Sequence, residues 1–428
     1  MVSGGERAVA RCDALGVPPY SAEPDMLFRA YLTPAHARTQ EAIGGWMREA
    51  GMLVRLDRAA NLVGRYDCDD PTAPALIIGS HIDSVRDGGN YDGPLGVMLG
   101  IECVAKLHAA GRRLPFPIEI IAFGDEEGSR FPASMLTSRA VAGILDPSVL
   151  NVTDREGISL GSALAAFNAH HEDAPFDGVR PIGGRLGLGD FIAARHRPAL
   201  AYLEAHIEQG PVLEAVGLPV GVVTGIAAQL RYQISVSGMA GHAGTTTMTL
   251  RNDALTAAAE MVLAAERVAK DAASDVVATV GRLMVAPGAP NVIPGGVDFT
   301  LDVRSLDLGR RDAAANAILA DMAAISDRRD AGIAIEQVND LPASPCDPRL
   351  INLLAASVVA IGQPDFRLPS GAGHDAMVMA ALCPTAMLFI RCEKGISHNP
   401  AERVDPADCE IALHAMLGFI DRLGESVA

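Results

Sequence analysis

Five residues of the types that bind divalent cations are spread along this chain. Three are histidines and two are carboxylates: His81, Asp92, Glu127, His206 and His398. A further carboxylate, Glu126, directly precedes Glu127. This set suits two cations that share one bridging carboxylate, with the spare carboxylate acting as a general base toward water. We therefore expect the chain to be an enzyme.

The carboxylates in this set are expected to have different roles. Adjacent side chains point in different directions, so we assign Glu127 to a metal and Glu126 to proton transfer. Asp83, or a nearby backbone carbonyl, is expected to accept a hydrogen bond from the second ring nitrogen of His81, although Asp83 could instead cap a turn. Asp92 precedes a predicted helix, where both a metal bridge and an ordinary N-cap are compatible with the sequence.

Three other residues are candidates for contact with a substrate. His242 lies among small residues and could polarise a carbonyl oxygen as the carbon becomes tetrahedral. Arg304 and Asn291 together are suited to gripping a substrate carboxylate. The alternative for Arg304 is a surface ion pair with Asp302.

Short apolar segments that resemble buried strands precede most of the candidate ligands. The expected strands span 75–79, 118–123, 201–204 and 386–390, with helices from Pro34 and over 95–108. Open α/β sheets collect ligands at the carboxyl ends of their strands. The candidate ligands are therefore expected to converge at one edge of a sheet.

The pattern changes near Gly217 and predicts a second domain. Strand-like and helical segments follow in the order β-β-α-β-β-α-β: 220–224, 230–236, 253–270, 276–285, 297–303, 312–325 and 333–338. We predict an α/β protein with a discontinuous metal-binding catalytic domain, 1–216 and 339–428, built on a central sheet. A small α/β sandwich is inserted at 217–338. Residues 145–200 are expected to form surface loops and short helices.

Composition narrows the class of protein. The net charge of −17 argues against binding to nucleic acid or to anionic membranes, which requires basic patches. The seven cysteines are scattered without a CxxC pair, which favours reduced thiols over a disulfide framework. There is no apolar run of membrane-spanning length, and the first residues lack a signal-peptide core. A cytoplasmic enzyme is the resulting expectation.

Several motifs together resemble the amidase branch of the M20 dinuclear metallohydrolases. They are HIDSV, GGNYDGPLG, FGDEEGSRF, EAHIEQGPVLE, GHAGTTTM, NVIPG, DVRS, SGAGHDA and GISHNPAE. The resemblance runs from about residue 30 to 420, and HIEQGP and SGAGHDA are the motifs specific to this branch. The branch contains N-carbamoyl-L-amino-acid hydrolases, β-ureidopropionases and allantoate amidohydrolases. One departure is Thr247, where the family commonly has proline.

The resemblance implies a role for each candidate residue. His81 and His206 would hold one metal, Glu127 and His398 the other, and Asp92 would bridge them. Glu126 would be the general base, and His242 would stabilise the oxyanion in the partner subunit of a homodimer. Substrate contacts would come from four residues: Gln209, Asn291, Arg304 and Gly373. The inserted domain would serve as both lid and dimerisation domain, and the central sheet would be mixed.

The resemblance also implies a substrate class. The resemblance favours allantoate, an anionic ureido compound, as the substrate, with release of ammonia and carbon dioxide. The nearest alternative is an N-carbamoyl-L-amino-acid hydrolase or β-ureidopropionase, and a dipeptidase or aminoacylase is more distant. A binding protein with an inactive site would lack at least one of the metal ligands or Glu126, and all of these residues are present. Imidazole and carboxylate ligands without cysteine suit zinc, manganese, cobalt or nickel.

Overall fold

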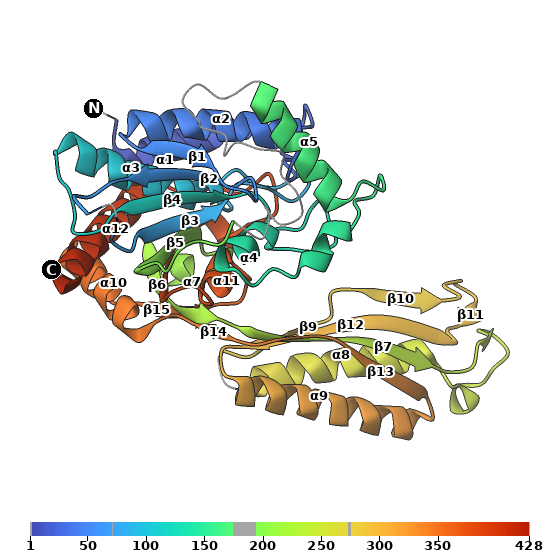
Figure 1. Ribbon diagram of the computed structural model, residues 1–428. Helices are drawn as coiled ribbons and strands as arrows, with labels where there is room; N and C mark the ends of the chain where they lie inside the picture. Colours follow the sequence, from blue (N-terminus) through green and yellow to red (C-terminus); the bar gives the residue numbers. More distant parts are fainter. Residues whose placement is uncertain (1, 71, 174–193, 273–274, 428) are drawn as a thin grey trace. The chain divides into compact units, whose positions relative to one another are not determined.

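The structure is a computed structural model that describes residues 2–70, 72–173, 194–272 and 275–427. The described chain divides into two compact units. The larger unit comprises residues 1–224, 346–368 and 373–428, and the smaller comprises 225–345 with 369–372. Figure 1 shows the elements of both units.

The larger unit is built on a mixed sheet. Among the described residues this sheet has nine strands, in the order β1-β2-β4-β3-β5-β16-β6-β14, with β15 also paired to β6. Strands β3, β4, β5 and β16 run parallel to one another, whereas β2 and β6 are antiparallel to their neighbours β4 and β16. The strands are β1 (Leu53–Leu56), β2 (Leu62–Tyr66), β3 (Leu76–His81), β4 (Ile118–Phe123), β5 (Ala201–Ile207), β6 (Val220–Ile226), β14 (Ser344–Pro345), β15 (Arg367–Ser370) and β16 (Thr385–Ile390).

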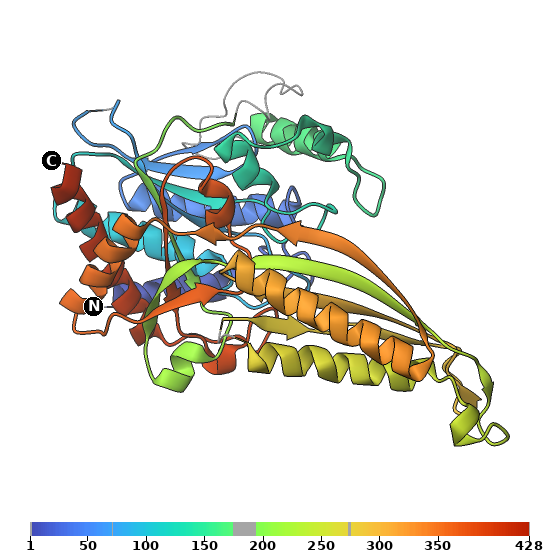
Figure 2. The same cartoon turned by 90° about the horizontal axis from the view of Figure 1, so that it is seen from below.

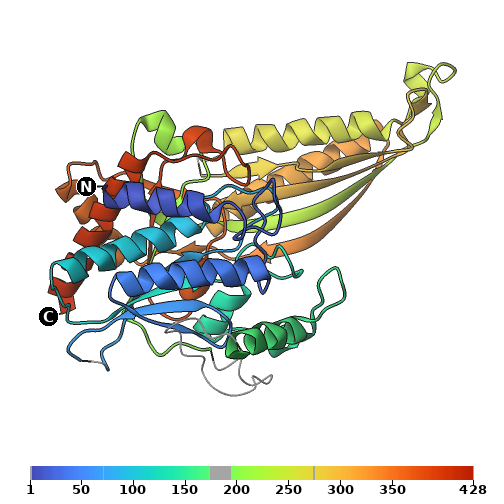
Figure 3. The same ribbon diagram turned by 90° about the horizontal axis from the view of Figure 1, so that it is seen from above.

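The central parallel strands are buried along their whole length, as expected for strands covered on both faces. Helices supply that cover, and Figure 3 shows α1, α2 and α3 beside one another. Thr33 caps α2 as its sequence predicts, by accepting a hydrogen bond from the backbone N–H of His36. The helices of this unit are α1 (Gly4–Leu15), α2 (Pro34–Glu49), α3 (Pro94–Ala109), α4 (Leu136–Ala142), α5 (Leu160–Asp173), α7 (Val212–Val216), α10 (Pro348–Ala360), α11 (Asp375–Met379) and α12 (Pro406–Val427).

The smaller unit has its own sheet and its own apolar core. Its main sheet has the order β10-β12-β7-β13, with β9 also paired to β12, and β8 and β11 form a separate pair. Figure 2 shows helices α8 and α9 lying along one face of the main sheet. The elements are β7 (Ala228–Ser237), β8 (Gly241–His242), α8 (Ala254–Asp271), β9 (Val277–Thr279), β10 (Leu283–Ala286), β11 (Val292–Ile293), β12 (Gly296–Ser305), α9 (Leu308–Arg329) and β13 (Gly332–Leu341).

Three details differ from the sequence-based expectations. The segment 220–224, expected in the inserted domain, is part of β6 and pairs with β16 of the larger sheet, so the division falls at Gly225 rather than at 217. The expected strand over 276–285 is two strands, β9 and β10. Within 145–200 the structure contains α5, a longer helix than expected, and residues 174–193 lie outside the described part.

All seven cysteines are free thiols, and six of them are buried. In the described part of the chain, none of the helices is both long enough and apolar enough to cross a membrane.

Candidate metal centre and substrate residues

The predicted ligands come together at the carboxyl edge of the parallel strands. His81 is the last residue of β3, and His206 lies near the end of β5. Glu127 and His398 lie in the segments that follow β4 and β16. Because these strands are parallel and in register, their carboxyl ends meet at one edge of the sheet.

Asp92 lies at the centre of this group. Its Oδ1 is 3.2 Å from His206 Nε2 and 3.8 Å from His81 Nε2. Its Oδ2 is 3.2 Å from His398 Nε2, which is itself 3.4 Å from Glu127 Oε1. Each oxygen of one buried carboxylate therefore faces a different set of potential ligands.

The orientation of the two buried histidine rings fits a bound cation. His81 Nδ1 is 3.2 Å from the backbone oxygen of Asp83, and His206 Nδ1 is 2.9 Å from that of Ile207. When each Nδ1–H donates a hydrogen bond to the neighbouring backbone oxygen, the lone pair of each Nε2 is left to bind a cation. The two Nε2 atoms are 3.4 Å apart, so a cation between them would relieve the repulsion of their lone pairs.

Four groups of potential ligands in the described chain satisfy the geometric requirement of a metal site, and two of the four share Asp92. His81, Asp92 and His206 form one group, and Asp92, Glu127 and His398 form the other. Within each group the ligand atoms all lie within 4.8 Å of one another. These two groups share Asp92, so the residues present fit a pair of cations bridged by one carboxylate. Nitrogen and oxygen ligands without sulfur suit zinc, manganese, cobalt or nickel.

Asp83 supports the site in two ways. Its backbone oxygen faces His81, as described above. Its buried carboxylate accepts hydrogen bonds from the backbone N–H groups of Glu126 and Glu127, at 3.0 and 3.1 Å. The segment after β4 is thereby held beside the histidines.

The carboxyl groups of the site differ in their affinity for a proton. Burial raises the pKa of Glu126 well above its usual range, opposed by His81 and reinforced by Glu127. Burial also raises the pKa of Glu127, to about 7, against the opposing charge of His81. Burial has the same tendency at Asp92, but hydrogen bonds with His206 and His398 outweigh it and hold the pKa well below its usual range. Glu126 is thus the carboxyl most inclined to hold a proton, and Asp92 the one most inclined to stay ionised.

Helix α3 starts beside the site without a side-chain cap. Its N-cap is Gly93, with φ of 88°, so the alternative role of Asp92 as an ordinary N-cap is wrong. A Cβ atom at Gly93 would lie 2.5 Å from the ring of His81. A glycine is therefore required for both the backbone angle and the close approach of the ring.

Gln209 lies against Asp92. Its Nε2 donates to both carboxylate oxygens, at 3.2 and 3.1 Å, and the Ser397 hydroxyl donates to Oδ2 at 2.8 Å. Gln209 and His398 both have φ of 56°, a left-handed conformation that is uncommon outside glycine and concentrates at functional sites. Gly373 is also near: a Cβ there would lie 3.9 Å from Glu126 Oε1.

Sequence reasoning missed three buried residues that support this site. Glu402 Oε1 accepts hydrogen bonds from the backbone N–H groups of Tyr91 and Asp92, at 2.7 and 3.1 Å. Glu204 accepts from Ser80, Tyr202 and Ala376, and the His374 ring lies 4.5 Å from that of His206. These residues occur within the motifs noted above, but their spacing alone indicates no partner.

His242 and Asn291 lie close together in the smaller unit. His242 in β8 is paired with Val292 in β11, and the N–H of Ala243 donates to the backbone oxygen of Asn291 at 3.0 Å. Both His242 and Asn291 are exposed.

Arg304 lies elsewhere in the same unit. It is eight residues beyond Gly296, the first residue of β12, which corresponds to about 26 Å along the strand. Figure 1 shows β11 at one end of this sheet and β9, which pairs with β12 at Arg304, at the other. Arg304 and Asn291 of one chain are therefore too far apart to bind the same small carboxylate together.

The ion pair between Arg304 and Asp302 is present, as the alternative interpretation expected. Arg304 donates to both oxygens of Asp302, at 2.7 and 3.1 Å, and Arg231 donates to Oδ2 at 2.8 Å. These three side chains line a cavity of about 560 Å³, together with Tyr232 and Thr300. Two arginines share one carboxylate here, which leaves one positive charge available to an anion.

Known proteins with similar sequences cover nearly the whole chain. An allantoate deiminase from Arabidopsis thaliana is 40% identical over 97% of this chain and 82% of its own. An N-carbamoyl-L-amino acid amidohydrolase from Geobacillus stearothermophilus is 38% identical over 93% of each chain. A solved hydantoinase/carbamoylase family amidase from Burkholderia ambifaria is 36% identical, with a TM-score of 0.87 over 99% of this chain and 98% of its own.

Residues 77–422 match the family described as Peptidase family M20/M25/M40. This range contains all five predicted metal ligands and Glu126. The smaller unit, with His242 and Arg304, lies within it as well. The chain is therefore a member of the M20/M25/M40 family, related to its amidohydrolases.

Proposed function

We propose that this protein is a two-metal amidohydrolase of linear ureido compounds, with allantoate as its substrate. The observation that carries the proposal is the pair of ligand groups that share Asp92, with Glu126 beside them. Similarity over nearly the whole chain to amidohydrolases of non-peptide C–N bonds supports the reaction class. The enzyme acts in the cytoplasm as a homodimer that releases ammonia and carbon dioxide.

Each residue of the site has a chemical task. Bound cations would polarise the substrate carbonyl and activate water, with His81 and His206 holding one, Glu127 and His398 the other, and Asp92 bridging. Glu126 takes a proton from water and delivers it to the leaving nitrogen. Its raised pKa suits a group that must hold the proton between these two events. The Asp83 carboxylate keeps Glu126 in place by accepting a hydrogen bond from the backbone N–H of Glu126.

The substrate carboxylate is bound by Arg304, whose guanidinium Asp302 holds in place. Arg231 and Arg304 both pair with the single negative charge of Asp302, and the one positive charge that remains suits a monoanionic carboxylate. Gln209 and Gly373 contact the ureido end of the substrate, since both lie beside the catalytic carboxylates.

His242 and Asn291 act on the substrate of the partner subunit. Arg304 lies about 26 Å along β12 from Gly296, the residue of that strand nearest to β11 in sequence, which is too far for Arg304 and the β8–β11 pair of one chain to contact one small substrate. Three exposed apolar residues flank His242 in sequence, as suits a surface that meets another subunit: Met239, Met248 and Leu250. Through this contact the inserted domain serves as lid and dimerisation domain, and His242 stabilises the oxyanion.

Complementation between two inactive variants tests this arrangement. Glu126→Gln and His242→Ala enzymes are mixed, dissociated and reassembled. If His242 acts across the dimer, each mixed dimer contains one intact site, and a statistical mixture recovers roughly a quarter of the wild-type activity. If His242 acts within its own chain, no activity returns. Size-exclusion chromatography with light scattering verifies the dimer independently.

Substrate choice is tested by ammonia release from allantoate compared with a panel of N-carbamoyl-L-amino acids. A higher kcat/KM for allantoate supports the proposal. A preference for a carbamoyl amino acid or for N-carbamoyl-β-alanine would retain the mechanism and reassign the substrate to the carbamoylase or β-ureidopropionase class. Preferential hydrolysis of dipeptides or N-acyl amino acids would contradict the ureido assignment.

A further inference from the structure

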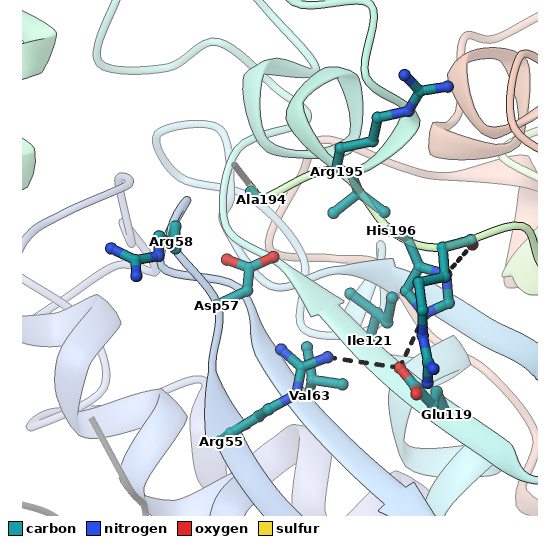
Figure 4. A pocket seen from close by; sticks show the side chains of 11 residues that line it. Arg55, Asp57, Arg58, Val63, Glu119, Ile121, Ala194, Arg195 and His196 are labelled. Atoms are coloured by element: carbon teal, nitrogen blue, oxygen red, sulfur yellow. Dashed lines mark hydrogen bonds and ion pairs between the residues drawn. The ribbon is translucent and has the colours of Figure 1, made fainter. Parts of the chain in front are cut away.

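Two buried glutamates lie within strands of the larger sheet, and their surroundings differ. Glu119, near the start of β4, is paired with arginines: it lies 2.7 Å from Arg65 and 3.6 Å from Arg55. Figure 4 shows the Arg55 guanidinium directed toward Glu119. Glu204, in β5, is fully buried, and in the described part of the chain no arginine or lysine forms an ion pair with it. Arginines thus compensate the charge of Glu119, whereas Glu204 is held by other contacts.

Glu204 joins three elements through hydrogen bonds from neutral groups. Its Oε1 accepts a hydrogen bond from the Ser80 hydroxyl of β3, at 3.0 Å. Its Oε2 accepts one from the backbone N–H of Ala376 in α11, at 2.9 Å, and the Tyr202 hydroxyl of β5 lies 3.1 Å from the same oxygen. Because Ser80 directly precedes His81, Glu204 ties the end of β3 to α11.

The first turn of α11 takes its acceptor from Glu204. The backbone N–H groups at the start of a helix have no partner within the helix and need one from elsewhere. The N-cap of α11, His374, makes no side-chain hydrogen bond to this turn. The N–H of Ala376 donates to Glu204 instead. This contact fixes the start of α11 and the two residues before it, Gly373 and His374.

These two residues contact the candidate metal centre. The ring of His374 lies 4.5 Å from that of His206, in an edge-to-face arrangement. A Cβ atom at Gly373 would lie 3.9 Å from Glu126 Oε1. Glu204 and His206 are two residues apart in β5, so their side chains project from the same face of the sheet. Glu204 therefore lies beside a predicted metal ligand and holds the segment whose ring packs against that ligand.

The contacts of His206 exclude a further cation at Glu204. Glu204, His206 and His374 form one of the groups whose potential ligand atoms lie within 4.8 Å of one another. His206 Nδ1 is 2.9 Å from the backbone oxygen of Ile207, however, and Nε2 is 3.2 Å from Asp92 Oδ1. Neither ring nitrogen of His206 is left for another ion, so this group serves to position the ring.

We propose that Glu204 is a positioning residue of the metal centre, which fixes the His206 ring and the segment containing Gly373 through its hydrogen bond to α11. This inference rests on the two-metal function proposed above. Loss of a residue that orients a metal ligand lowers cation affinity by roughly 10–100-fold. Removal of Glu204 should therefore weaken the cation held by His81 and His206 more than the cation on the other side of Asp92.

The test is competition titration of the chelated enzyme with zinc and a chelating dye, at a temperature where every variant is folded. Glu204→Met removes the acceptor at similar side-chain size, and it is expected to weaken one cation at least tenfold and the other less than threefold. Glu204→Gln keeps an oxygen acceptor and should restore both affinities to within threefold of the wild type. The matched control is Glu119→Met, a buried glutamate of a neighbouring part of the sheet, which should lower the unfolding temperature but change both affinities less than threefold.

A milder variant keeps the proposal testable if Glu204→Met does not fold. Ser80→Ala removes one donor to Glu204 and is expected to weaken the same cation three- to tenfold. If Glu204→Met weakens both cations equally, or if Glu119→Met reproduces its selective loss, the positioning role is overturned. Wild-type affinities in Glu204→Met, in an enzyme that binds two cations, overturn only the role of Glu204. A wild-type enzyme that binds fewer than two cations overturns the two-metal function itself.

Discussion

Glu402 anchors the backbone of Asp92 across a separation of 310 residues in sequence. A single oxygen of Glu402 accepts the N–H groups of Tyr91 and Asp92, and the glutamate is fully buried. The carboxylate that faces both ligand groups is thus positioned by a residue far from it in sequence.

Removing this anchor should weaken metal binding. Glu402→Ala is expected to lower cation affinity by about 10–100-fold, the usual effect of losing a residue that orients a ligand. Glu402→Gln retains an oxygen acceptor and should restore most of the affinity. Competition titration with a chelating dye measures both. Equal losses in the two variants would indicate that the charge of Glu402, rather than its hydrogen bonds, is what matters.

Glu126→Gln should lose catalysis but retain its cations. The amide cannot accept a proton from water, so kcat is expected to fall by about 10²–10⁴-fold. Elemental analysis should give the wild-type metal content, because Glu126 belongs to neither of the two ligand groups that share Asp92. Exposed Glu41→Gln is the control. Activity near that of the wild type would remove Glu126 from its proposed role.

Arg304→Ala should raise KM for carboxylate substrates much more than it lowers kcat. Asp302→Asn is expected to have the same effect at smaller magnitude, because the Asp302 carboxylate orients the Arg304 guanidinium by accepting two hydrogen bonds from it. Substrate analogues with a neutral amide in place of the carboxylate should be insensitive to both changes. A KM that stays constant in Arg304→Ala would favour the purely structural role of its ion pair.

Metal removal should destabilise the protein as well as inactivate it. Cation binding to the folded state adds about 2.7 kcal/mol at a free concentration 100 times Kd for each site. The chelated enzyme is therefore expected to unfold at a lower temperature in calorimetry and to recover on addition of manganese or zinc. Elemental analysis should find two ions per chain, and one ion per fully active chain would exclude the bridged pair.

Glu119 should contribute stability that is lost in acid. Burial disfavours its ionised form, but His196, Arg55 and Arg65 outweigh this and lower its pKa to about 2. Its contribution is present above the unfolded pKa, near roughly 4.3, and disappears as the pH falls toward 2. Glu119→Gln should cost about 3 kcal/mol at pH 7, with the difference from wild type shrinking between pH 4.5 and 2. Chemical denaturation at several pH values measures this difference.

The sequence indicates the candidate metal ligands better than it indicates the residues that position them. His81, Glu127 and His206 are recognisable because each follows an apolar strand, and parallel strands bring such residues to one edge. Glu402 carries no such indication, since its partner is 310 residues away and only the folded chain brings them together. The same limit applies to Arg304 and Asn291, because residues 13 apart in sequence can still lie far apart when a long strand separates them.

The boundary of the inserted domain illustrates a second limit. Residues 220–224 have the apolar pattern of a buried strand, and that pattern is compatible with either sheet. Pairing of β6 with β16 assigns them to the larger sheet. Strand pairing depends on residues distant in sequence, so local composition could not have distinguished the two.

The order in which the ligands occur along the chain has a consequence for biosynthesis. His81 and Asp92 are made early, whereas His398 and the anchoring Glu402 are made more than 300 residues later. A nascent chain on the ribosome would therefore lack the second ligand group and its anchor during most of its synthesis. On the proposed assignment, the full set of ligands and its anchor would exist only once synthesis has passed Glu402, so metal loading would follow translation of nearly the whole chain.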